Sequence, residues 1–195
     1  MKRYAYVGIL TAALLLCGCA ARDAEGRAEA IQRKYAAMDG YAARVEVDVA
    51  RQDETAHYAL DASRSGDTAR VTVVWPEELA GVGAVMEGDE LSLSYDGVVL
   101  DAGGVDASVT AVNASDIVIH AVAQGWITEQ NDERWEDVDA LRLRIETERE
   151  GRALYVAVWF NEQDMPLYAE IERDGRVLAN LEFTDFAFGD MPTDT

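Results

Sequence analysis

The 195-residue sequence is poor in cysteine, histidine and positive charge, and each shortage excludes a class of protein. It has two cysteines, both close to the N-terminus, so no disulfide framework supports the core. It has two histidines, His57 and His120, and no ligand spacing typical of zinc. With 17 Lys and Arg against 37 Asp and Glu, the formal net charge is -20. This charge excludes nucleic acid as a partner, because a phosphate backbone requires a basic surface.

The few residues able to support catalysis do not form a recognisable motif. Asp116 lies four residues before His120 and could share its helix face, but no serine nucleophile accompanies them, so we expect His120 to be a packed or edge histidine. Calcium is an alternative for Asp101 with Asp106, or for Asp164, yet neither segment matches an EF-hand loop. The acids are better interpreted as ordinary turns. We therefore predict no enzymatic activity, no metal and no cofactor.

The two cysteines lie in the segment "LLLCGCAARD" (residues 14–23), directly after a basic start and an apolar run over 4–16. That run is too short to span a bilayer. Leu16-Cys17-Gly18-Cys19 resembles the bacterial lipobox. The resemblance implies that residues 1–18 are a signal peptide and that Cys19 is diacylated, with 19–23 as a short tether. It places the protein on the extracytoplasmic face of the cell membrane, held by a lipid anchor.

Three alternatives to this interpretation exist. The segment could be an ordinary secretory signal with incidental cysteines, an uncleaved N-terminal helix, or a redox or metal-binding cysteine pair. The pair is disfavoured because Cys17 leaves with the signal peptide. The acidic charge disfavours docking on anionic lipid headgroups other than through the anchor.

Residues 24–190 are expected to form one domain, followed by a tail at 191–195. Apolar residues at helical spacing predict a helix over 24–38. Period-two alternation then predicts strands over 43–50, 57–62, 70–75, 90–95 and 98–104, and again over 141–146, 152–160, 167–173 and 176–188. Asp96-Gly97 and Asp174-Gly175 are typical hairpin turns.

A second helix is predicted over residues 113–125, capped by Asn113 or Ser115. It is apolar over most of its surface, which is typical of a buried helix. Its β-branched residues leave a strand as the alternative. The order of elements and the short connections predict an α+β fold: a strongly curved antiparallel sheet, with two helices covering its concave face.

This layout resembles the LolA/LolB-like lipoprotein carrier superfamily. The resemblance rests on the lipobox, the central "WPEELAGVGAVMEGDELSLSYDG", the interposed helix and the closing hairpin that ends in "FTDF". Within the superfamily the chain is more similar to the lipidated GerS-like germination lipoproteins. The resemblance implies an open half-barrel of about eleven strands, with helices covering an apolar cavity that holds acyl chains. The soluble carrier is not lipidated and has a lid arginine with no counterpart here, so no functional residue is carried over.

The strand residues expected on the concave face are the candidate cavity lining: Val45, Val47, Tyr58, Leu60, Val73, Trp75, Leu91, Leu93, Tyr95, Leu143, Trp159 and Leu181. If the second helix fills the concavity, these residues form a sealed core; if it moves, they form an acyl-chain site. Two functions follow. The protein binds a lipid in the concavity, or it is an envelope scaffold or regulator that binds a cell-wall enzyme or another protein partner.

Overall fold

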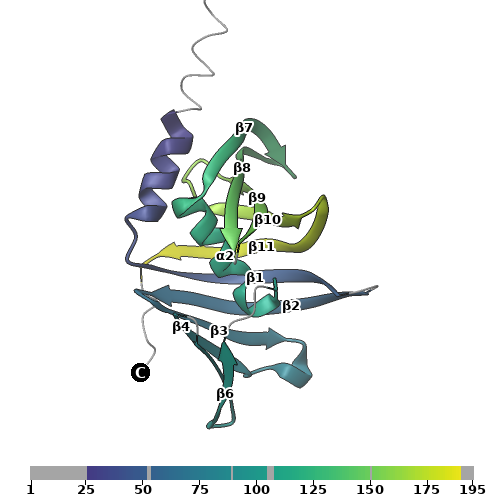
Figure 1. The fold of residues 1–195 in the computed structure, drawn as a ribbon. Helices are drawn as coiled ribbons and strands as arrows, with labels where there is room; N and C mark the ends of the chain where they lie inside the picture. The colour runs from purple at the N-terminus through teal and green to yellow at the C-terminus, as the bar shows by residue number, and fades with distance from the viewer. Residues whose placement is uncertain (1–25, 52–53, 89, 105–107, 150, 190–195) are drawn as a thin grey trace, which may run out of the picture.

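Eleven antiparallel strands form a single open sheet in the computed structural model (Figure 1). The structure describes residues 26–51, 54–88, 90–104, 108–149 and 151–189, so Cys19, the predicted signal and tether, and the tail lie outside it. A first helix covers residues 26–36. The remaining elements are β1 (Gly40–Arg51), β2 (Glu54–Ser65), β3 (Thr68–Trp75), the 3-10 turn η1 (Glu77–Leu79), β4 (Gly83–Glu87), β5 (Glu90–Tyr95), β6 (Val98–Gly104), α2 (Ala111–Gln124), β7 (Trp126–Trp135), β8 (Val138–Arg149), β9 (Arg152–Phe160), β10 (Pro166–Arg173) and β11 (Arg176–Phe188).

The strand order is β6-β5-β4-β3-β2-β1-β11-β10-β9-β8-β7. Two meanders of consecutive hairpins therefore meet where β1 pairs with β11, and β6 and β7 are the two edges. The first helix and α2 both lie on the concave side of the bent sheet (Figure 1). This arrangement confirms the predicted fold class, a curved antiparallel sheet with helices on its concave side, and it has the eleven strands that the resemblance implied.

Both predicted hairpin turns are present, and their backbone explains the sequence. Asp96 and Gly97 have φ values of 50° and 76°, and Asp174 and Gly175 have φ values of 53° and 74°. Two successive residues with positive φ make a type I′ turn, whose twist matches that of paired strands. Tyr95 and Val98 consequently pair directly across the first turn.

Helix α2 begins two residues before the predicted start. Its N-cap is Thr110, not Asn113 or Ser115. The Asn113 backbone N–H donates to Thr110 Oγ1 at 3.4 Å, and the Thr110 N–H donates to Asn113 Oδ1 at 2.9 Å, which completes a capping box. The helix ends at Gly125, where a Cβ would lie only 2.6 Å from the Ala121 carbonyl oxygen.

The first helix is fixed to the loop between β9 and β10. Arg27 Nε donates to Asp164 Oδ1 at 3.1 Å, and Arg27 Nη2 donates to the Asn161 carbonyl at 2.6 Å. Tyr35 donates its hydroxyl proton to the Asp164 carbonyl at 3.0 Å, and its ring packs edge-on against Phe160. Asp164, an alternative calcium ligand in the sequence, is thus engaged by the helix.

Candidate functional site

The part of the concave face under α2 is filled with side chains. Five predicted lining residues are at most 1% exposed and belong to the main core cluster: Val45, Val47, Leu60, Leu143 and Leu181. The apolar face of α2 belongs to the same cluster through Ile117, Val118 and Val122. Tyr58 and Val73 are partly buried and pack against it. Here the helix acts as a core element.

The burial of Tyr41 agrees with a filled core on this part of the concave face. Its side chain is 1% exposed in the core cluster. Burial raises the pKa of the Tyr41 hydroxyl well above its ordinary value of 10, and the nearby Asp116 carboxylate raises it further. The raised pKa is thus a consequence of the burial of this hydroxyl, which disfavours the charged phenolate.

Trp159 is not on the concave face as predicted; it lies on the convex one. In β9, Val158 and Phe160 belong to the main core, whereas Trp159 packs with Ala140 and Ala157 in a second cluster. Trp135 and Tyr168 stack beside it with ring centroids 4.0 Å apart. Because β9 is apolar on both faces, its sequence could not indicate which residues point inward.

Trp75 is also on the convex face, because a β-bulge changes the alternation of β3. Leu60 pairs with Val73 and Ala59 pairs with Trp75, so Val74 is the extra residue. The Trp75 ring lies 5.2 Å from the ring of His57 and is 50% exposed. The His57 ring is itself bound on this face, with Nδ1 2.7 Å from Asp48 Oδ1.

The remaining predicted residues lie on the part of the concave face that α2 leaves open. Helix α2 packs on β1, β2 and β8 to β11. Beyond it, Leu93 is partly exposed and Tyr95 is 57% exposed. Register places Val98 opposite Tyr95 and Leu100 opposite Leu93, so all four share one face. We call Leu93, Tyr95, Val98 and Leu100 the apolar wing; Leu91 lies farther along the same face of β5.

The apolar wing borders a shallow hollow of about 430 Å³, which Val82 also lines. Val98 is 59% exposed and Leu100 is 62% exposed. Adjacent, strongly exposed aliphatic side chains are unusual on a protein that acts alone and typically mark a binding surface. Val98 to Leu100 were predicted to lie in a hairpin but not to line the concave face. Their run of apolar residues directly after the turn was the available signal.

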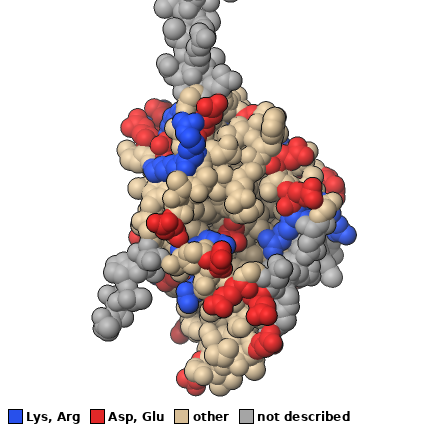
Figure 2. Space-filling view, turned by 60° about the vertical axis from the view of Figure 1, so that its left-hand side comes forward, with Lys and Arg blue, Asp and Glu red and all other residues tan. Residues whose placement is uncertain are grey.

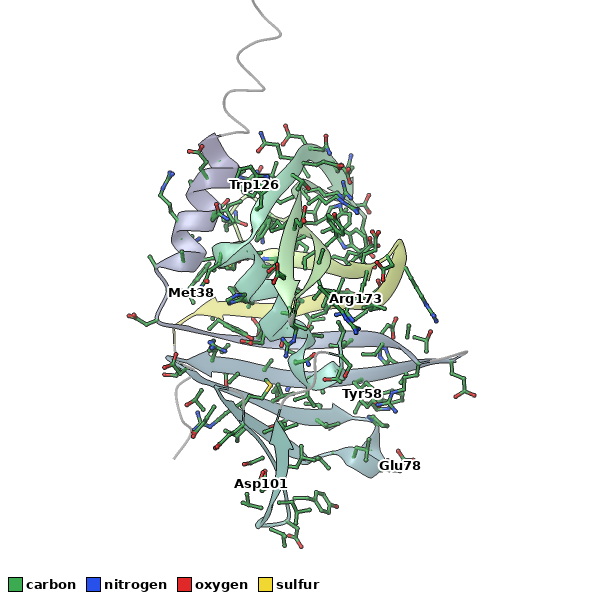
Figure 3. The ribbon with its side chains drawn as sticks, in the orientation of Figure 1. Met38, Tyr58, Glu78, Asp101, Trp126 and Arg173 are labelled. Carbon is green, nitrogen blue, oxygen red and sulfur yellow. The ribbon has the colours of Figure 1, made fainter. Side chains whose placement is uncertain are left out.

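The charged residues of β5, β6 and the turn between them are all acidic. No Lys or Arg occurs between Arg70 and Arg134, and Glu90, Asp96 and Asp101 are exposed on or beside β5 and β6. Asp101 projects from β6 at the end of the molecule opposite the first helix (Figure 3). On the face seen in Figure 2, that end shows uncharged surface bordered by acids. A partner of this surface would be apolar at its centre and basic around it.

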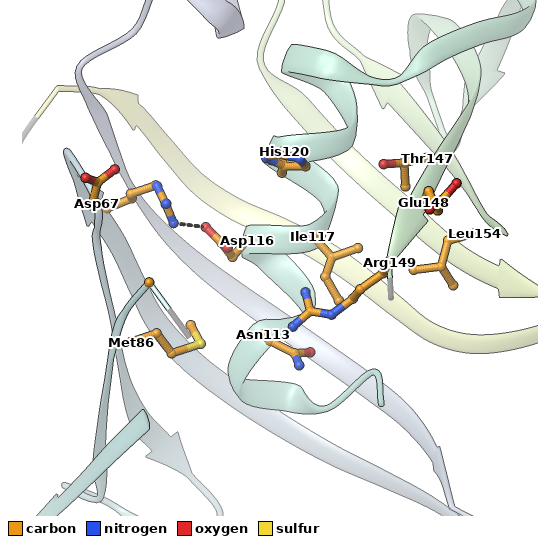
Figure 4. A pocket seen from close by; sticks show the side chains of 12 residues that line it. Asp67, Met86, Asn113, Asp116, Ile117, His120, Thr147, Glu148, Arg149 and Leu154 are labelled. Carbon is orange, nitrogen blue, oxygen red and sulfur yellow. Dashed lines mark hydrogen bonds and ion pairs between the residues drawn. The ribbon is translucent and has the colours of Figure 1, made fainter. Parts of the chain in front are cut away.

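A second hollow, of about 360 Å³, opens beside α2 (Figure 4). Its lining includes Met86, Asn113, Ile117, His120, Arg149 and Leu154. Arg64 crosses to α2 and binds Asp116, with Nη1 2.6 Å from Oδ1. Asp116 therefore faces Arg64 and no bond joins it to His120, which is exposed. The described residues that line this hollow include Thr147 but no serine or cysteine.

Within the described ranges there is neither a metal-binding cluster nor a membrane-spanning helix. No group of three or more His, Cys, Asp or Glu side chains among those residues is placed to hold a metal ion. No helix within residues 26–51, 54–88, 90–104, 108–149 or 151–189 is long and apolar enough to cross a membrane. Asp106, an alternative calcium ligand in the sequence, lies outside these ranges.

Solved structures with a similar fold are known for this chain, whereas the sequence comparisons found no relative. No family model and no curated protein matches the chain. Similar solved structures include a LolA superfamily protein from Nitrosomonas europaea, at 16% identity and TM-score 0.47, with 85% of this chain and 94% of that chain covered. Lipoprotein LppX from Mycobacterium tuberculosis is similar at 13% identity and TM-score 0.47, covering 86% and 97%. A Clostridioides difficile structure of the CwlD amidase with the GerS lipoprotein matches at 16% identity and TM-score 0.40, covering 85% and 95%.

Proposed function

We propose that this chain is a non-enzymatic binding protein of the cell envelope, which docks a protein partner on the apolar wing. The observation that carries the proposal is the contrast along the concave face. Under α2 the five predicted lining residues are 0–1% exposed, whereas Tyr95, Val98 and Leu100 are 57–62% exposed. Covering such side chains with a partner is favourable by about 25 cal/mol per Å² of apolar area.

The proposal includes the lipid anchor at Cys19 predicted from the sequence. The chain enters the domain through the first helix, and the apolar wing is at the opposite end (Figure 1). With the tether at 19–23, the wing would point away from the membrane, toward other envelope components. This geometry favours a protein partner over the bilayer itself as the occupant of the wing.

Binding of an acyl chain is the second candidate function. The hollow of about 430 Å³ at Val82, Leu93 and Leu100 falls in the size range of small-molecule sites. It is a shallow surface hollow, however, so a single chain bound there would keep one side in water. A carrier of the kind implied by the resemblance would need space under α2, where the core is filled.

The test is a photo-crosslinking amino acid at Leu100, introduced into the full chain in the cells that produce it. The matched control carries the same group at Val138, which is 44% exposed at the opposite end of the sheet. We expect one discrete protein adduct from position 100 and none from position 138, measured by mass spectrometry. An adduct with the mass of a fatty acid or phospholipid would favour the second candidate. No adduct at position 100 would contradict both.

A further inference from the structure

The two edges of the sheet differ in a way that singles out β6. Natural edge strands avoid unwanted pairing by carrying charges or being covered. Edge strand β7 follows this rule with Glu129, Asp132 and Glu133, and the first helix lies beside its start. Edge strand β6 follows it only at Asp101; next to the turn, Val98, Val99 and Leu100 are 59–68% exposed and uncharged, so this part of the edge is unprotected. The unprotected edge is part of the surface proposed above to bind a partner.

The main-chain groups of Val99 point to the free side of β6. In a two-residue type I′ hairpin, the pair next to the turn, Tyr95 and Val98, exchanges both hydrogen bonds. The following pair, Ser94 and Val99, exchanges none. The N–H and C=O of Val99 are therefore directed away from β5, where an added strand could bind them.

The two faces of the β5–β6 hairpin define the chemistry of such a strand. The concave face carries the apolar wing. The convex face carries Glu90 and Asp101, together with Val99 and Ser94. A strand that continues both faces would alternate apolar side chains with basic ones.

Resting on the proposed function, we propose that the partner binds as an added β-strand along β6, using an extended segment of alternating apolar and Lys or Arg residues. The apolar side chains extend the wing, and the basic ones approach Glu90 and Asp101. A second copy of this chain is a poorer occupant, since each copy carries a net charge of -20 and β6 has no basic residue. Like charges opposed across paired strands are destabilising.

The experiment uses the full chain in detergent micelles and a fluorescent peptide of about ten residues, the length of a long strand, alternating valine and lysine. A peptide with glutamate in place of lysine is the charge control. We expect saturable binding of the lysine peptide only, weakened by salt. Hydrogen exchange should slow in residues 98–104 and stay unchanged in 126–135.

Two matched proline variants test main-chain pairing. Val99→Pro removes an N–H from the free edge without breaking the β5–β6 ladder, and proline is tolerated on edge strands. It should weaken binding roughly tenfold. Gln130→Pro makes the corresponding change at an outward position of β7 and should leave binding unchanged.

The outcomes distinguish a failure of strand addition along β6 from a failure of the proposed docking on the apolar wing. If Leu100→Glu weakens binding but Val99→Pro does not, strand addition is wrong while docking on the wing stands. If neither variant matters, or the glutamate peptide binds equally well, both fail. Protection of 98–104 that depends on protein concentration without any peptide would mean that a second copy occupies the edge, and would overturn the inference.

Discussion

Replacing Leu143 by alanine is expected to lower the free energy of unfolding by about 2–5 kcal/mol. Leu143 is 0% exposed in the core cluster under α2, so its removal leaves a cavity that rigid neighbours cannot close. Domains of this kind are stable by roughly 5–15 kcal/mol, so the loss would be a large fraction of the total. Urea unfolding followed by circular dichroism measures it.

The matched control is Leu93→Ala on the same concave face. Leu93 lies on the apolar wing, beyond α2 and partly exposed, so truncation should cost well under half as much. The comparison separates the sealed core from an open acyl-chain cavity. Were the space under α2 such a cavity, Leu143→Ala would be as mild as Leu93→Ala, and a similar loss for both variants would contradict the filled core.

Replacing Cys19 by alanine is expected to release the protein from membranes. Each acyl chain contributes about 0.8 kcal/mol per buried CH₂, and two chains together give stable anchoring that one does not. Without them, the strongly acidic domain is not attracted electrostatically to an anionic bilayer. Fractionation followed by immunoblotting should find the wild type with membranes and the variant in the soluble fraction.

Cys17→Ala is the control for this change. Cys17 precedes the predicted cleavage site and would leave with the predicted signal peptide, so the variant should stay membrane-bound. A Cys19→Ala protein that remains with membranes would show that the anchor lies elsewhere, as an uncleaved N-terminal helix would provide. Release by both variants would point to a general failure of export.

Periodicity was sufficient to predict most of the fold. Alternation identified the strands around Val45, Leu60 and Leu143, because one face of each is buried. The aspartate-glycine turns identified both hairpins, because only a few residue types adopt positive φ readily. The resemblance to a known superfamily then supplied the open sheet, which no local pattern specifies.

Two strands escaped prediction for physical reasons. Edge strand β7 carries charges in place of an alternating pattern, as a protected edge does. Strand β4 has only five residues and begins at Gly83, a weak strand former. The start of α2 was misplaced because Thr110 and Asn113 are both good capping residues, and only their mutual hydrogen bonds distinguish them.

The candidate lining was predicted less completely than the fold. The predicted faces assumed uninterrupted alternation along each strand. The bulge at Val74 adds one residue to β3, so Trp75 lies on the face opposite to the predicted one. It also fails where both faces are apolar, as at Trp159. The sequence could not decide whether the second helix fills the concavity, since that depends on how side chains from β1, β8 and α2 fit together. The apolar wing lies outside the region in which these side chains pack together.

Native-state hydrogen exchange of α2 tests the central claim most directly, because a core helix and a mobile lid open with different free energies. The account predicts that the amides of residues 114–122 exchange only through global unfolding, with an opening free energy equal to that from urea, and that added palmitate does not change their rates. Opening of α2 at a free energy several kcal/mol below the global value, together with slowing by palmitate, would contradict it.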